Sequence, residues 1–471
     1  MSTKKWNSYR RRHYQTPKDN SNVLLIMGLI SVSALIALKN NSHLTYDQLT
    51  QNDYFNSSSL NYKFNSKFLE EDKNFILPGS HEFKSADFTK IDNYASSIRY
   101  DGTSVSELAS LLSHYAKTEP EKARIIYSWI AYNITYDVPA FYSGNYGYLS
   151  PQGVLRSRKG VCSGYAVLYE SLARAMGLEV SVIEGYSKGY GYVVGNTTQV
   201  NHAWNAVKIN NGWYLLDATW GAGKIDNGQF NKQLDPYYFA TPPEQFILKH
   251  FPAQEKWQLL EKHYSKQQFD TAPEIFPQFF KDRIQLVTHY DQTIQADGRF
   301  QVVLSAPEDT VTTSQLKSNS TFLNDTYTLV QKKDNKIILT IAPPVGNSEL
   351  EIFSKNKYMP GAYYQAIAYK VYSKSAGEEF PKIYSTFLEK NSYLYSPLYK
   401  HLPVAQSVYF KLEVPNALEV QVIDASSNTW TQLTRFGSTF VGNISVNSLD
   451  KIKVSAKFSG DEQYWTLVEY N

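Results

Sequence analysis

The sequence predicts an α+β domain followed by two all-β domains, with an apolar segment ahead of them. Between about residues 92 and 176, apolar side chains recur at helical spacing, and strand patterns around a polar turn follow. From about residue 285 onward, nearly every segment alternates apolar and polar side chains, as strands do. Helices followed by an antiparallel hairpin indicate an α+β fold rather than a doubly wound sheet.

Length, charge and cysteine content narrow the class of protein. The chain has 471 residues, which at roughly 100–200 residues per domain suggests about three domains. Its net charge of +3 gives no reason to expect a nucleic-acid partner. Cys162 is its one cysteine, so no disulfide can form within the chain. The sequence shows no clustered acidic loop resembling a calcium site, and we expect neither a metal nor a cofactor.

An uncharged apolar run at residues 23–38 reads VLLIMGLISVSALIAL and follows a basic tail, residues 1–22. The basic side chains of the tail are Lys4, Lys5, Arg10, Arg11, Arg12 and Lys18. A spanning helix needs about 17–25 apolar residues, whereas a cleaved signal has an apolar region of roughly 7–15. We therefore favour a transmembrane signal anchor over a cleaved signal. The basic tail would be cytoplasmic, and the rest of the chain would lie outside, at the cell surface.

A polar spacer is predicted at residues 39–90, and the α+β domain at residues 91–284. Two capping-box patterns, Ser104–Glu107 and Thr118–Glu121, predict the starts of its first helices. A further helix is predicted to begin at Cys162 or the residue after it.

Two β-sandwich domains of immunoglobulin-like type are predicted at residues 285–380 and 390–471. A weak repeat supports this division, because Ile352 and Ile452 belong to similar strand patterns offset by 100 residues. That offset is about the size of one immunoglobulin-like sandwich.

The position of Cys162 favours a reactive thiol. The residue stands in the segment KGVCSGY, directly ahead of an apolar helical pattern. At a helix N-terminus, unpaired N–H groups and the positive end of the dipole both favour the thiolate, which is the nucleophile.

A histidine and an acid lie on the two strands of the predicted hairpin. His202 stands in VNHAWNAV and Asp217 in WYLLDATW, and the strand period places both side chains on one face of the sheet. A two-residue turn at Asn211–Gly212 would place Asp217 opposite Ala206, while a looser turn would place it opposite His202. We predict the looser turn, because only that register makes the two residues direct neighbours. Asp217 could then orient the imidazole, and His202 could take the proton of a thiol.

These segments resemble the transglutaminase-like superfamily, which shares its core with papain-like thiol proteases. KGVCSGYAVLYESLARAMGLEVSVIEGY is similar to the nucleophile motif of the superfamily, and VNHAWNAVKINNGWYLLDATWGAG to its His and Asp motifs. KARIIYSWIAYNITYD and the following sandwich domains resemble the kyphoscoliosis-peptidase branch. The resemblance implies Cys162 as nucleophile, His202 as base and Asp217 as orienting acid. Beside these, we name Gln152 as a candidate oxyanion donor, and Trp204 and Trp220 as walls of the substrate site.

The expected function is that of a membrane-anchored thiol enzyme. Cys162 would attack an amide carbonyl of a protein or peptide, and water or an amine would resolve the thioester. A cell-wall peptide is one candidate substrate. The alternative is a catalytically silent adhesion or scaffold protein that reuses the fold, since fold does not dictate activity.

Overall fold

The computed structural model describes residues 79, 83, 86–147, 149–190, 192, 199–446 and 451–471. The predicted basic tail, the signal anchor at 23–38 and nearly all of the spacer lie outside these residues, so they stay predictions. Within the described ranges, no helix has both the length and the apolar character needed to cross a membrane.

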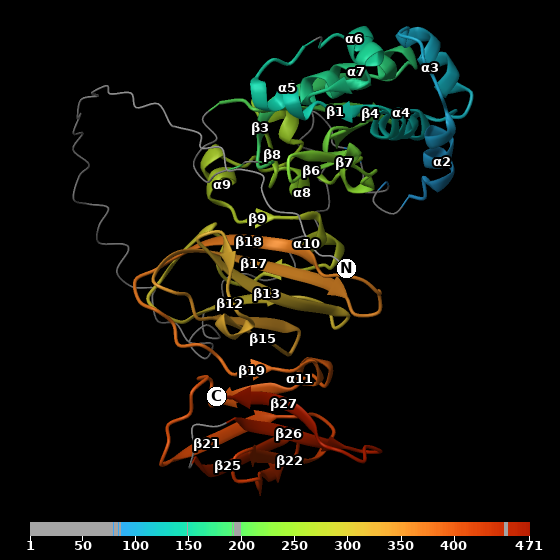
Figure 1. Cartoon of the computed structure of the whole chain (residues 1–471). Coiled ribbons are helices and arrows are strands. Elements are labelled where there is room, and N and C mark those ends of the chain that lie inside the picture. Colours follow the sequence, from blue (N-terminus) through green and yellow to red (C-terminus); the bar gives the residue numbers. More distant parts are fainter. Residues whose placement is uncertain are drawn as a thin grey trace, which may run out of the picture. The chain divides into compact units, whose positions relative to one another are not determined.

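The first domain starts with a set of helices (Figure 1), two of which begin where the capping patterns predict. Its helices are α2 (Thr89–Ser97), α3 (Val105–Ser113), α4 (Glu119–Asn133), α5 (Val138–Ser143), α6 (Pro151–Ser157) and α7 (Cys162–Ala175). Thr118 and Glu121 form the complete capping box of α4. Ser104 caps α3 through the Glu107 amide, but the Glu107 carboxylate accepts from the Tyr100 hydroxyl instead of closing the box.

An antiparallel sheet with the order β5-β4-β3-β8 carries the second half of this domain. Its strands are β3 (Val180–Ser187), β4 (His202–Ile209), β5 (Gly212–Leu216) and β8 (His250–Pro252). A short parallel pair, β1 (Thr135–Tyr136) and β2 (Lys159–Gly160), joins the end of α4 to the start of α7. The α7 helix packs on β4, where the Asn205 amide donates to the Ala166 carbonyl at 3.1 Å.

The helical core surrounds α4, in which nine consecutive residues, Ala123–Ala131, are buried. One of these residues is Arg124, whose guanidinium donates two hydrogen bonds of 2.8 Å to the carboxylate of Asp92. Ser128 donates to the same carboxylate. A charge buried this deeply is tolerated because it is paired and hydrogen-bonded. This ion pair fixes α2 against α4.

Shorter elements follow β5 and complete the first domain. They are η4 (Trp220–Ala222), β6 (Gly223–Asp226), β7 (Gln229–Lys232), η5 (Pro236–Tyr238), α8 (Pro243–Phe246), η6 (Glu255–Gln258) and α9 (Lys266–Thr271). Phe246 and Trp257 from this segment pack with Trp204 and Leu215 in a second core cluster. The segment after β5 therefore covers the sheet face that carries His202.

The first sandwich consists of two sheets, with the strand orders β10-β12-β16-β15 and β11-β18-β17-β13-β14. β9 also pairs with β18. Its elements are β9 (Glu274–Ile275), α10 (Pro277–Lys281), β10 (Gln285–Leu286), β11 (Thr293–Ala296), β12 (Phe300–Ser305), β13 (Thr310–Ser318), β14 (Thr321–Phe322), η7 (Asp325–Tyr327), β15 (Thr328–Lys333), β16 (Lys336–Ile341), β17 (Gly346–Asn356) and β18 (Tyr364–Ser373).

The second sandwich repeats this arrangement, with the orders β20-β21-β25-β24 and β19-β27-β26-β22-β23. Its elements are β19 (Lys382–Ile383), α11 (Ser385–Glu389), β20 (Tyr393–Ser396), β21 (Gln406–Glu413), β22 (Ala417–Asp424), β23 (Thr429–Gln432), β24 (Thr434–Phe436), β25 (Thr439–Val446), β26 (Ile452–Phe458) and β27 (Trp465–Tyr470). Ile352 on β17 and Ile452 on β26 are both buried in equivalent strands, as the repeat predicts.

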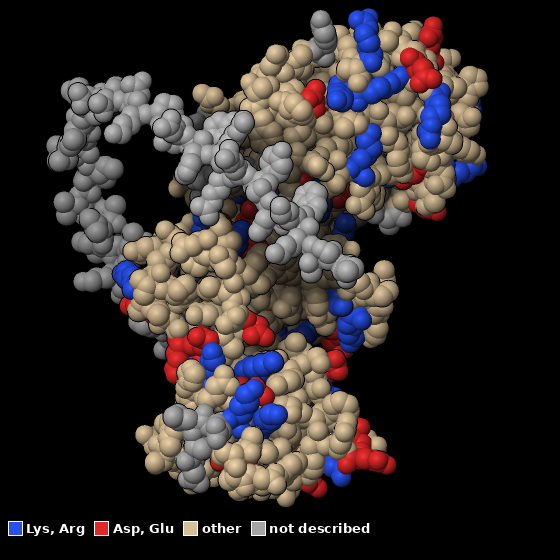
Figure 2. Space-filling view, in the orientation of Figure 1, with Lys and Arg blue, Asp and Glu red and all other residues tan. Residues whose placement is uncertain are grey.

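Both sandwiches begin earlier than the predicted boundaries at residues 285 and 390. Ile275 and Phe279 lie in the core of the first sandwich, and Phe387 lies in the core of the second. The sequence missed these starts because each is a short strand or single helical turn without a full period of alternation. On the face shown in Figure 2, Lys and Arg lie interspersed with Asp and Glu, and most of that surface consists of other residues.

Candidate active site

Cys162 is the first residue of α7, as the sequence predicts. The residue before it, Val161, is the N-cap and provides no side-chain hydrogen bond, so the first N–H groups of the helix remain available. Burial raises the pKa of the Cys162 thiol. Three other effects lower this pKa: the hydrogen bond to His202, the charge of that imidazole and a hydrogen bond with the Ala203 backbone. The pKa of the thiol is therefore below its ordinary value. The thiol is therefore biased toward the thiolate.

His202 is the first residue of β4, on the part of that strand that extends beyond β5. The preceding residue, Asn201, anchors this end, because its side-chain oxygen accepts from the Ser187 backbone amide at 2.8 Å. Directly opposite His202 on β3 is Gly185, where an added Cβ would collide with the Phe251 carbonyl and the Trp204 ring. The small residue leaves room for the rings that pack above it.

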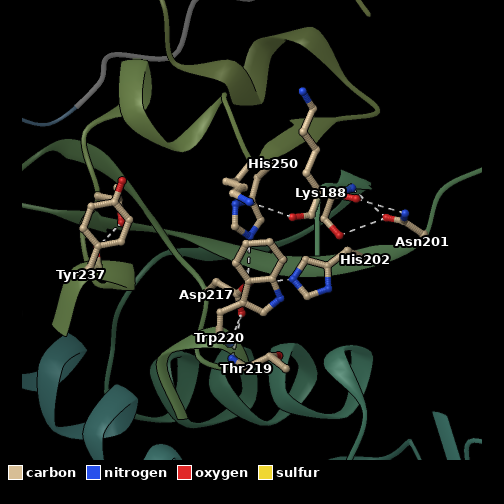
Figure 3. Close-up of polar contacts among 11 residues, drawn as sticks. Lys188, Asn201, His202, Asp217, Thr219, Trp220, Tyr237 and His250 are labelled. Atoms are coloured by element: carbon tan, nitrogen blue, oxygen red, sulfur yellow. Dashed lines mark hydrogen bonds and ion pairs between the residues drawn. The ribbon is translucent and has the colours of Figure 1, made fainter. Parts of the chain in front are cut away.

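Asp217 is fully buried, and its carboxylate accepts four hydrogen bonds. One carboxylate oxygen, Oδ1, accepts from the backbone amides of Thr219 at 2.8 Å and Trp220 at 3.0 Å. The other, Oδ2, accepts from His202 Nε2 at 2.7 Å and from His250 Nε2 at 2.9 Å. Figure 3 shows the two imidazoles approaching Asp217 with the Trp220 ring beside them. Because Nε2 of His202 is engaged, Nδ1 is the ring nitrogen left for the thiol.

The predicted hairpin register was wrong, although the shared face was correct. The turn consists of Asn210 and Asn211, with φ of 49° and 68°, so it is a tight two-residue turn and not a looser one. In this register Asp217 is opposite neither Ala206 nor His202, and β5 ends one residue before it. The observed pairing differs from both predicted registers by two residues, and a shift of two keeps every side chain on its face.

The charges of the site reinforce one another. Burial lowers the pKa of His202, but the Asp217 carboxylate and the Cys162 sulfur together raise it to about 10. Burial raises the pKa of Asp217, yet the charges and hydrogen bonds of His202 and His250 hold it well below its usual range. The site therefore favours an ionised acid, a protonated His202 and a thiolate.

His250 is the residue that the sequence did not reveal. It lies on β8 with 1% of its surface exposed, and its ring stacks on Phe246 with the centroids 4.0 Å apart. The residues around it follow no helical or strand period, and β8 has only three residues. The one available signal is a histidine within an apolar segment, FILKHFP, which alone is more typical of a core residue.

The ligand atoms of His202, Asp217 and His250 lie within 4.8 Å of one another, close enough to consider a metal ion. Both imidazoles already donate to the same carboxylate oxygen at hydrogen-bond distance. The three side chains are also nearly inaccessible, with at most 7% of their surface exposed. We therefore assign the group to hydrogen bonding.

The three predicted substrate-binding residues differ in their surroundings. Trp204 is 1% exposed and packs in the core behind His202 and His250, so its predicted role as a substrate wall does not fit its burial. Trp220 is partly exposed, and its ring centroid lies 5.3 Å from that of His202, where it can form a wall. Gln152 is exposed in the first turn of α6, and its role as an oxyanion donor stays a prediction.

Comparison with known proteins matches two regions of the chain to domain families. Residues 107–218, which include all three predicted catalytic residues, match the Transglutaminase-like superfamily. Residues 266–384 match the KY-like, immunoglobulin-like domain. The chain therefore carries a transglutaminase-like domain followed by a KY-like immunoglobulin-like domain.

Part of the chain is similar to curated relatives of the kyphoscoliosis-peptidase branch. The chain is 32% identical to kyphoscoliosis peptidase of Homo sapiens over 275 residues, which are 57% of this chain and 40% of the relative. It is 30% identical to hillarin of Drosophila melanogaster over 212 residues, 41% of this chain and 26% of the relative. A crystal structure of a TGase matches 33% of this chain and 37% of its own at 21% identity, with a TM-score of 0.20. The predicted resemblance to the kyphoscoliosis-peptidase branch is confirmed, and the matched region spans less than half of these relatives.

Proposed function

We propose that this protein is a thiol acyl-transfer enzyme in which Cys162, His202 and Asp217 form a catalytic triad. The observation that supports this most directly is that Asp217 holds Nε2 of His202 at 2.7 Å, which leaves Nδ1 for Cys162 at the start of α7, and that His202 lowers the pKa of the thiol. A scaffold protein has no need to bury an acid and two histidines beside a thiol on a helix N-terminus.

The proposed reaction begins with attack of the Cys162 thiolate on an amide carbonyl carbon of a protein or peptide. The backbone N–H groups at the start of α7 can stabilise the oxyanion. His202 then gives its proton to the leaving amine, and a thioester forms on Cys162. In the second half, His202 accepts a proton from water or from an amine, which attacks the thioester and releases the Cys162 thiolate, so the ion pair with His202 is restored. Water gives hydrolysis and an amine gives cross-linking.

We also propose a location for the enzyme, based on its N-terminal sequence. A signal anchor at residues 23–38 would hold the enzyme on the membrane, with the described domains on the outer surface. Its substrates would then be surface or cell-wall peptides.

The test is alkylation of Cys162 in the full chain. Because Cys162 is the one cysteine, iodoacetamide incorporation reports this residue alone. We expect wild-type protein to react with a midpoint well below the ordinary cysteine pKa of about 8.5. His202→Ala should lose this early reactivity. His263→Ala, which changes a histidine with 41% of its side chain exposed, is the matched control and should leave the profile unchanged.

Either of two results would overturn the proposal. One is an ordinary thiol in the wild type, with a midpoint near 8.5. The other is an early midpoint that survives in the folded His202→Ala variant. In both cases the scaffold alternative would take its place.

A further inference from the structure

Asp217 has a second imidazole partner that the triad does not account for. His250 reaches it from β8, while His202 reaches it from β4, and both strands flank β3. The β3 residues opposite them are Gly185 and Ser187, which are small, so both rings fit over the same sheet face. The two Nε2 atoms meet at one oxygen, Asp217 Oδ2.

The position of Asp217 is fixed without His250. Its Oδ1 is held by the amides of Thr219 and Trp220, and its own amide donates to the Tyr238 carbonyl at 2.9 Å. The hydrogen bond from His250 is therefore available to change the charge distribution of the carboxylate more than its location. A donor on Oδ2 withdraws charge from the same oxygen that stabilises the His202 imidazolium.

The surroundings of His250 favour a neutral imidazole that donates a hydrogen bond from Nε2. Its Nδ1 is buried and has no hydrogen-bond partner among the described residues, so a proton there would be a buried, unsatisfied donor. The charged or titratable groups that face it are Asp217, His202 and the Lys249 ammonium, together with the Tyr238 ring at 6.4 Å. Burial lowers the pKa of His250 to about 4, and the charges of His202 and Lys249 add to this, against the opposing effect of Asp217.

We propose that His250 is a positioning residue that acts through Asp217: its neutral Nε2–H competes with His202 for Oδ2 and limits how strongly the acid holds the His202 proton. The inference rests on the proposed function, because it concerns the same thiol–imidazole pair. Without the competing donor, the imidazolium would be a weaker acid. It would then deliver its proton to a leaving amine less readily, even though the ion pair with Cys162 would be more stable.

The experiment compares His250→Phe with His250→Gln in the full chain. Phenylalanine keeps the flat ring against Phe246 and removes the donor, whereas glutamine keeps an N–H donor. The pH profile of Cys162 alkylation has a lower midpoint, where the thiol ionises beside the imidazolium, and an upper midpoint, where the imidazolium loses its proton. We expect His250→Phe to raise the upper midpoint by about one pH unit, a tenfold weaker acid. His250→Gln should restore the wild-type value, and the His263→Ala control should match the wild type.

A purely structural role predicts no rise of the upper midpoint. If His250 only packed the site, its loss would loosen Asp217, and the upper midpoint would stay or fall in His250→Phe. That result, in protein shown to be folded by circular dichroism, would overturn the inference while leaving the triad intact. A wild-type profile with no early midpoint would instead refute the proposed function itself.

A measurement on the wild type covers the case in which His250→Phe does not fold. Nitrogen-15 NMR of labelled histidines reports the tautomer and charge of each ring. We expect His250 to be neutral and protonated on Nε2 at pH values where His202 is charged. A charged His250, or the Nδ1–H tautomer, would overturn the inference.

Discussion

Two hairpins in different domains have the same type of turn but differ at their open ends. The β4–β5 hairpin of the transglutaminase-like domain turns at Asn210 and Asn211, and the β15–β16 hairpin of the first sandwich turns at Asp334 and Asn335, all four with φ between 49° and 68°. In both, two left-handed residues match the right-handed twist of the strands. The same local rule therefore sets the register in a candidate active site and in a scaffold.

The two hairpins differ at their open ends, which are the strand ends away from the turn. β15 and β16 pair along their whole lengths, so the last residue of one faces a partner on the other. β5 stops at Leu216, and β4 continues past it to His202, where its paired strand is β3. Asp217 leaves the sheet at this point and places its carboxylate next to the His202 ring. An unequal hairpin thus makes room for a buried charge that an equal one would exclude.

Removing the buried acid should give the largest effect. Asp217→Ala leaves the donors of Thr219, Trp220, His202 and His250 without their acceptor, and we expect it to lower the free energy of unfolding by about 3–5 kcal/mol. Asp282 in the first sandwich is the matched control. It is also buried, but among the described residues its carboxylate accepts a single hydrogen bond, from the Gln278 amide at 2.8 Å, so Asp282→Ala should cost about 1 kcal/mol.

Urea unfolding of the two variants, followed by circular dichroism, measures both values. If both variants lost the same free energy of unfolding, this would contradict the view that the unequal hairpin stabilises a buried charge. Asp217→Ala should also abolish the early alkylation of Cys162, and Asp282→Ala should leave it unchanged.

Titration of His202 should give the next largest effect, on stability against pH. Its pKa is raised from 6.5 to about 10 in the folded protein. A group with a raised folded pKa contributes stability that is fully present below its unfolded pKa and is lost as pH rises through the folded one. Stability should therefore fall between pH 6.5 and about 10, by on the order of a few kcal/mol.

The measurement belongs in a Cys162→Ser background, where the thiol cannot titrate. Without the sulfur, which helps to raise the pKa of His202, we expect the fall in Cys162→Ser to begin near pH 6.5 and to end below about pH 10, and we expect a flatter curve in Cys162→Ser with His202→Gln. Urea unfolding at a series of pH values provides the data. A curve of equal slope in both proteins would show that His202 is not held in its charged form by Asp217.

The sequence predicted those parts of the site that depend on period and local chemistry. The start of α7 at Cys162 followed from a helical pattern, and the common face of His202 and Asp217 followed from strand alternation. His250 was not predictable, because its contact with Asp217 depends on a strand that returns to the sheet more than thirty residues later. The burial of Trp204 likewise depends on Phe246 and Trp257, whose packing no local pattern encodes.

The smallest effect on stability should come from substitutions in the two turns. Asn211→Gly and Asn335→Gly each place glycine at a left-handed position, where it has no steric cost, so each should raise the free energy of unfolding by a few tenths of a kcal/mol, up to about 1. Urea unfolding should show similar gains, because the two turns obey the same rule. Cys162 alkylation should be unchanged in both, since glycine preserves the register that places Asp217. A gain confined to Asn335→Gly, with altered alkylation in Asn211→Gly, would show that the β4–β5 turn is under strain that serves the site, and the two hairpins would then differ at the turn as well as at their ends.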